Sequence, residues 1–206
     1  MRNLVKQKAI LRMAGYAALI AVIGFTMAAC GGGGAKKSGL KTDGFFGALP
    51  AIYADHSLAD TAIREKFQIA KEKAEKKQNA KAYQKANDQF SKDLEELGNK
   101  LKANVDAEAA KLAGKDVPFT TSDNFREFKV NSLKVNEKAN LTLSASDVKK
   151  NMIGVTSFKY KAIAKDGSVI IDYVGYGSEA VTISGAMRGN PEKWVDFDKI
   201  EFSNGQ

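Results

Sequence analysis

The single cysteine of this 206-residue chain, Cys30, is the side chain best suited to covalent chemistry. Its thiol could form a disulfide or carry a covalent modification, but a disulfide within the chain needs a second cysteine. Cys30 stands between the apolar run 13–29 and the glycine run 31–34. We therefore expect a modified cysteine rather than a structural one.

The only histidine, His56, lies between Asp55 and Ser57 in a segment with helical spacing. Neighbouring residues of a helix point to different sides, so these three cannot form a nucleophile, a base and an orienting acid. We interpret His56 as a partly exposed residue without a catalytic role.

Carboxylates are the remaining candidates for catalysis. Asp196 and Asp198 alternate across Phe197, so on a strand both would point to one face. Glycoside hydrolysis uses two carboxyls about 5 to 10 Å apart. Neither this pair nor the acidic residues within 93–96 has the spacing of a calcium-binding loop, so we expect no metal and no other cofactor.

The residues around the cysteine have the organisation of a secretory signal. Four basic residues precede the apolar run 13–29, and small residues end it. Met27, Ala28, Ala29 and Cys30 resemble the lipobox of bacterial lipoproteins. The competing interpretation is a retained transmembrane helix, but seventeen residues are at the lower limit of about 17 to 25 needed to span a bilayer.

The lipobox resemblance implies that the protein is located in the cell envelope. It implies that residues 1–29 are cleaved as a signal peptide and that Cys30 then carries a diacylglycerol that inserts into the membrane. Gly31 stands where an aspartate commonly retains lipoproteins in the inner membrane of enteric bacteria, which favours the outer membrane by analogy. No acidic residue precedes Asp43, unlike the acidic export signals of surface lipoproteins in Bacteroidota, which favours the periplasmic side.

The charge of the mature chain argues against nucleic acid as a partner. The formal net charge is +8, and the four basic residues before Cys30 account for half of it. The remaining charges of both signs are mixed along every segment, whereas a nucleic-acid binder shows a basic patch with aromatic platforms. The 176 residues after Cys30 suffice for one or two small cores.

Hydrophobic periodicity predicts two long helices. Apolar residues recur at spacings of three, four and seven from Ile52 to Ala74, after a proline at position 50 that suits a first helical turn. A second stripe runs from Tyr83 to Val105, and residues 76–79 form the turn between the two. A short connection makes the helices antiparallel, so we expect a helical hairpin; one continuous helix is the alternative.

After residue 118 the period changes to two, which is typical of strands. About seven short strands predict a small antiparallel β-sandwich of immunoglobulin-like size, with bulges at phase slips near Val130 and Ile200. Trp194, Tyr160 and Tyr173 are expected in its core. Tyr176, flanked by two glycines in a predicted loop, is a candidate contact residue.

The sequence thus predicts an α+β chain with four parts. These are a signal peptide (1–29), the lipidated cysteine with a glycine- and lysine-rich tether (30–44), a helical hairpin (45–114) and a β-sandwich (115–206).

Two classes of function fit this organisation. The first is a non-enzymatic, lipid-anchored adaptor that presents its hairpin to a protein partner. One form of this class is a periplasmic holdase, because chaperones of the outer-membrane pathway also carry hairpins on a β-body. The second class is a hydrolase that works through a carboxylate pair. The oligomeric state stays open.

Overall fold

The computed structural model describes residues 37–149, 157–176 and 180–204. The chain divides into two compact units, 1–34 and 35–206, and all described residues belong to the second. The predicted signal peptide and Met27, Ala28, Ala29 and Cys30 lie outside the described residues. Among those described, no helix combines the length and hydropathy that crossing a membrane requires.

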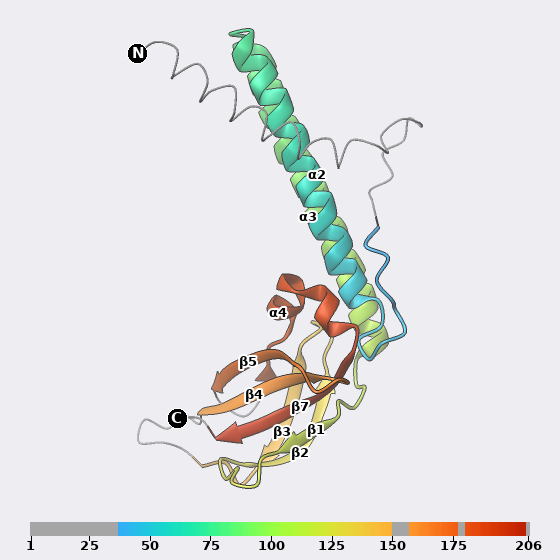
Figure 1. Ribbon diagram of the computed structural model, residues 1–206, viewed down its shortest axis with the longest axis vertical. Coiled ribbons are helices and arrows are strands. Elements are labelled where there is room, and N and C mark those ends of the chain that lie inside the picture. The colour runs from blue at the N-terminus through green and yellow to red at the C-terminus, as the bar shows by residue number, and fades with distance from the viewer. Residues whose placement is uncertain (1–36, 150–156, 177–179, 205–206) are drawn as a thin grey trace, which may run out of the picture. The chain divides into compact units, whose positions relative to one another are not determined.

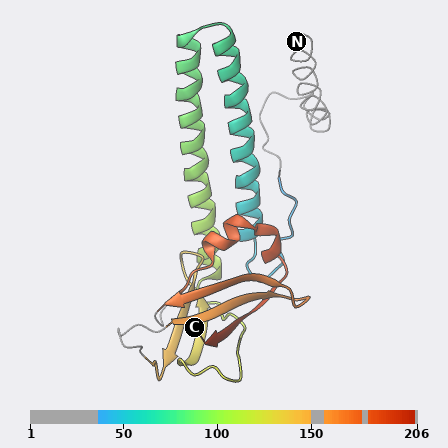
Figure 2. The ribbon, with the colours of Figure 1, turned by 60° about the vertical axis from the view of Figure 1, so that its left-hand side comes forward.

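Two long antiparallel helices form the predicted hairpin, α2 (Leu49–Lys76) and α3 (Ala80–Leu112) (Figure 2). Pro50 lies in the first turn of α2, where its missing N–H leaves no helical hydrogen bond unmade. At the turn Gln78 has a positive φ of 47°, and the side chain of Asn79 accepts a hydrogen bond from the Ala82 N–H. This cap starts a new helix, so the single continuous helix is excluded.

Within the described residues, seven strands, a short helix and one 3-10 turn follow the hairpin. Their arrangement is shown in Figure 1. Strands β1-β7-β4-β5 form a four-stranded sheet, and β2-β3-β6 form a three-stranded sheet. The elements are β1 (Phe119–Thr121), β2 (Lys129–Val135), β3 (Leu141–Ser146), β4 (Ser157–Ala164), β5 (Val169–Tyr176), β6 (Ala180–Val181), α4 (Ser184–Gly189), η2 (Pro191–Trp194) and β7 (Phe197–Asn204).

The α+β class and the hairpin are confirmed, with differences in the strands. β1, which the periodicity did not indicate, pairs with β7 in parallel, with Phe119 opposite Ile200. The other strand pairs are antiparallel. Two predicted strands merge into β2 across a register shift at Val130 and Ser132, where a bulge was expected.

One hydrophobic core joins the β-strands to the hairpin. Phe158, Ile200 and Phe202 of the four-stranded sheet are fully buried and belong to the same cluster as Leu49 of α2 and Leu112 of α3. The predicted boundary between residues 114 and 115 therefore does not separate two cores. The first turns of α2 and the last turns of α3 belong to the β-body.

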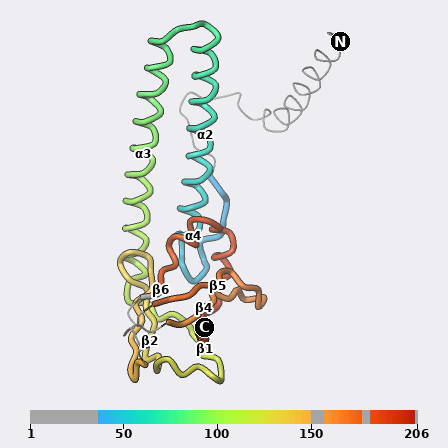
Figure 3. Tube along the Cα trace, turned by 90° about the vertical axis from the view of Figure 1, so that its left-hand side faces the viewer, coloured from blue at the N-terminus to red at the C-terminus, as the bar shows by residue number. Residues whose placement is uncertain are grey.

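Part of the segment 37–48 packs against the body, although residues 37, 39 and 41–43 are exposed. The Ser38 N–H donates to the carboxylate of Asp55, so the chain runs beside the first turns of α2 (Figure 3). Phe46 is fully buried, and a Cβ on Gly44 would clash with the Val195 carbonyl oxygen. The contacts at Ser38 and Gly44 involve the main chain, and polar composition does not reveal contacts of this kind.

Candidate functional site

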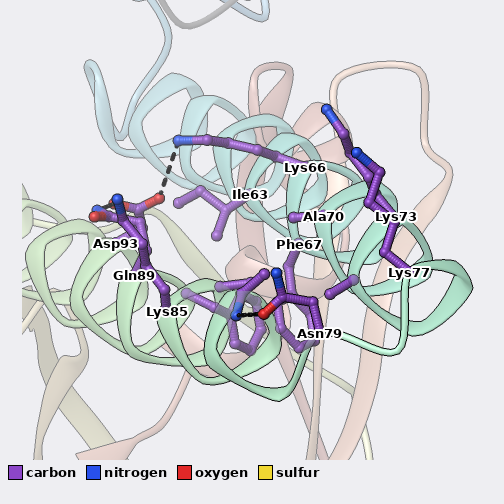
Figure 4. Close-up of a pocket in the computed structure, with 14 residues that line it drawn as sticks. Ile63, Lys66, Phe67, Ala70, Lys73, Lys77, Asn79, Lys85, Gln89 and Asp93 are labelled. Atoms are coloured by element: carbon purple, nitrogen blue, oxygen red, sulfur yellow. Dashed lines mark hydrogen bonds and ion pairs between the residues drawn. The ribbon is translucent and has the colours of Figure 1, made fainter.

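The site of greatest interest is a groove between the distal halves of the two helices, lined only by residues 63–93 (Figure 4). It encloses about 420 Å³. Its floor is apolar and is supplied by Ile63, Phe67, Ala70, Ala74, Ala82, Ala86 and Phe90. We call this surface the hairpin groove.

Helical spacing places these side chains in one line. Phe67 of α2 and Phe90 of α3 stack across the hairpin, with ring centroids 4.4 Å apart and an interplanar angle of 21°. Both rings are only half-buried, unlike the aromatic residues of the main core. The hairpin groove thus keeps apolar area that the fold itself does not cover.

Lysines form the rim of the groove. Lys66, Lys73 and Lys77 come from α2 and Lys85 comes from α3. Lys66 Nζ lies 3.5 Å from a carboxylate oxygen of Asp93 and so bridges the two helices at the end nearer the β-body. Within the described ranges, no ion pair joins the other three lysines.

Asp93 is the one acidic residue of the lining, and it is already engaged. Its carboxylate accepts a hydrogen bond from the Gln89 amide and another from Lys66. The Gln89 hydrogen bond, followed by the nearby charge of Lys66, holds the pKa of Asp93 below its ordinary value. The groove therefore offers three unpaired cations above an apolar floor, which suits an anionic amphipathic ligand.

The predicted carboxylate pair does not lie on one strand. Asp196 lies in the turn before β7 and lines a second hollow together with Asp166 and Glu192. Asp198 lies on β7 and does not line that hollow. Their predicted common strand face is wrong, because Asp196 precedes the strand. In the part of the chain that is described, no three histidine, cysteine or acidic residues are grouped as metal ligands.

The aromatic residues were predicted in part. Trp194 and Tyr160 are buried, as expected, but the side chain of Tyr173 is 51% exposed because it lies on β5, the edge strand of its sheet. Tyr176 is 71% exposed and ends β5 instead of lying in a loop. It lies outside the hairpin groove, and its role as a contact residue stays a prediction.

His56 lies outside the hairpin groove, and its surroundings shift its pKa. Burial, followed by the charge of Arg188 on α4, lowers the pKa of His56 below its usual 6.5, while Asp60 on the same helix opposes the shift. The unfolded chain then binds a proton at a higher pH than the folded chain does. Stability is therefore expected to be complete above about pH 6.5 and to fall as the pH drops toward the folded pKa.

This prediction can be checked by urea unfolding between about pH 5 and 8. The free energy of unfolding of the wild type should decrease on acidification relative to that of His56→Gln. If the two curves stay parallel over this range, the lowered pKa of His56 is contradicted.

No protein-family model, curated protein or solved structure matches the chain. We therefore infer the function only from the residues and their geometry. The sequence had predicted the helices that build the groove but not the groove itself. The net charge summed over residues 52–113 is only +1, and this sum does not show that lysines are concentrated near the turn.

Proposed function

We propose that this protein is a lipid-anchored adaptor of the bacterial cell envelope that binds a partner protein through the hairpin groove. The anchor would be a diacylglycerol on Cys30, in the outer membrane and facing the periplasm. The adaptor role would be non-enzymatic. The observation that carries the proposal is the uncovered apolar floor around Phe67 and Phe90, rimmed by unpaired lysines.

The arrangement of the core supports this role. The base of the hairpin is fixed in the β-body by fully buried residues, including Leu49 and Ala109. The distal half contributes only Ala74 to the buried residues, so its helices pack mainly on each other. A rigid base with an uncovered distal groove is suited to presenting a binding surface. Exposed apolar strips rimmed by polar residues commonly mark protein interaction sites.

The anchor would limit where the groove can act. Seven residues lie between Cys30 and Ser38, the first residue held by α2, so the two are at most about 29 Å apart when the chain is extended. The base of the hairpin would therefore remain within about this distance of the bilayer. A partner would be met in the envelope at the membrane surface.

Metabolic labelling with a fatty-acid analogue tests the anchor. The wild-type chain should incorporate the label and fractionate with membranes, because the thiol of Cys30 is the attachment site that the lipobox resemblance implies. The variant Cys30→Ser should do neither. Equal labelling of both chains would contradict lipidation at this residue. The adaptor role is tested separately, by cross-linking from the groove floor.

A further inference from the structure

The shape of the hairpin groove matches a helix. Its α2 side runs from Ile63 to Lys77, about 21 Å at 1.5 Å per residue, and apolar side chains enter it at spacings of three and four from both helices. A third helix packs into such a groove at an axis separation of about 8 to 10 Å. A flat bilayer would instead contact the outward faces of the two helices and would not reach a concave floor.

The charge of the hairpin is divided along its length. Residues 71–85, at the turn, carry six lysines and two glutamates, a net charge of +4. The rest of the helical region, residues 52–70 and 86–113, carries six basic and nine acidic residues, a net charge of −3. The groove extends across both parts: six of its fourteen lining residues, among them Lys73, Lys77 and Lys85, lie in the basic part.

The basic region at the turn, residues 71–85, also differs from the rest of the hairpin in its ion pairs. Below the turn, Lys92 pairs with Glu96 at 3.8 Å, Lys111 pairs with Glu108 at 2.8 Å, and Lys102 pairs with Asp106. Within the described residues, no ion pair involves any lysine of the turn region, namely Lys71, Lys73, Lys76, Lys77, Lys81 and Lys85. The turn region thus has positive charge that the fold does not neutralise.

We infer that the hairpin groove binds an amphipathic α-helix of about 15 residues whose apolar face meets the Phe67 and Phe90 rings and whose flanks carry acidic side chains opposite Lys73, Lys77 and Lys85. This inference rests on the proposed adaptor function and adds the chemistry of the partner. The three lysines set the preference for acidic flanks, and the phenylalanine pair supplies the buried contact. If two copies of this chain met through their grooves, the rim lysines of one would face those of the other. The repulsion between these charges disfavours self-association through the groove.

Two designed peptides of about 15 residues test the inference. They share one apolar stripe at helical spacing, and their flanking positions are all glutamate in one and all lysine in the other. Each is titrated against the full chain held in a nanodisc of neutral phosphatidylcholine. The glutamate peptide should bind at least about tenfold more tightly than the lysine peptide. Its affinity should fall as the salt concentration rises.

Charge-reversed variants provide the matched controls. The triple variant Lys73→Glu, Lys77→Glu, Lys85→Glu should reverse the preference, so that the lysine peptide binds more tightly. The variant Lys92→Glu, Lys100→Glu, Lys102→Glu makes the same change of charge outside the groove lining and should leave the preference for the glutamate peptide in place.

Three results would overturn the inference. They are an unchanged preference in the groove variant, an equal affinity for both peptides, and no binding of either peptide at about 1 mM. If phosphatidylglycerol vesicles bind the wild type and not the groove variant while neither peptide binds, an anionic membrane replaces the helix as the ligand. A cross-link from the groove in cells without any peptide preference would reject this inference and leave the adaptor function standing.

Discussion

Replacing Phe46 with alanine is expected to lower the free energy of unfolding by about 3 to 5 kcal/mol. The Phe46 ring is fully buried, 4.9 Å from the ring of Phe197 and 5.5 Å from that of Trp194, measured between centroids. Truncation leaves a cavity that the surrounding rings cannot close without moving. The loss is large against the total of about 5 to 15 kcal/mol that is usual for a folded domain.

Chemical unfolding of both chains measures this difference. Tyr176→Ala removes an aromatic side chain that is 71% exposed and should change the free energy of unfolding by no more than about 0.5 kcal/mol. A Phe46→Ala effect as small as that of Tyr176→Ala would contradict the burial of Phe46 in the core.

A fragment of residues 115–206 is expected not to fold cooperatively by itself. It would lack Phe46, Leu49 and Leu112, which are buried in the same cluster as Trp194 and Phe197 of the β-body. It would also lose the hydrogen bond from the Gly114 N–H to the Val135 carbonyl. The exposed apolar face should cause aggregation.

The matched comparison is the fragment 37–206, which keeps the segment before α2 and the whole hairpin. Heat should unfold it in one transition, while the shorter fragment aggregates or shows no transition in its near-UV circular dichroism. A soluble 115–206 fragment with a sharp transition would show that the β-body does not need the base of the hairpin.

Local rules were sufficient to predict the hairpin. The apolar spacing, Pro50 and the polar turn predicted two antiparallel helices, and the predicted turn at residues 76–79 lies where α2 ends and α3 begins. The phase slip near Val130 likewise predicted the bulge of β2. Each of these features depends on residues close together in the sequence.

Features that depend on distant contacts were missed. The β1 strand pairs in parallel with β7, about eighty residues later, and its three residues are too few to show a period. Tyr173 follows the alternation of a core strand, yet it is exposed because β5 lies at the sheet edge. Periodicity identifies a strand but not its place in a sheet.

The groove had one signal that sequence reasoning could have used. Lys92 and Lys102 each have an acidic residue four positions later, which predicts an ion pair on one helical face. Lys81 instead has Lys85 at that spacing, and Lys73 has Lys77. Like charges at this spacing leave positive charge without a partner, and a net charge summed over the whole hairpin does not show it.

Photo-cross-linking in cells tests directly whether the hairpin groove binds a partner in the envelope. A photo-reactive amino acid replaces either Ala86, on the groove floor, or Ala103, exposed on the same helix but outside the lining. We expect one discrete protein adduct from position 86, none from 103, and loss of that adduct when Lys73, Lys77 and Lys85 are all changed to glutamate. The absence of an adduct from position 86, or the same adduct from both positions, would contradict binding through the groove.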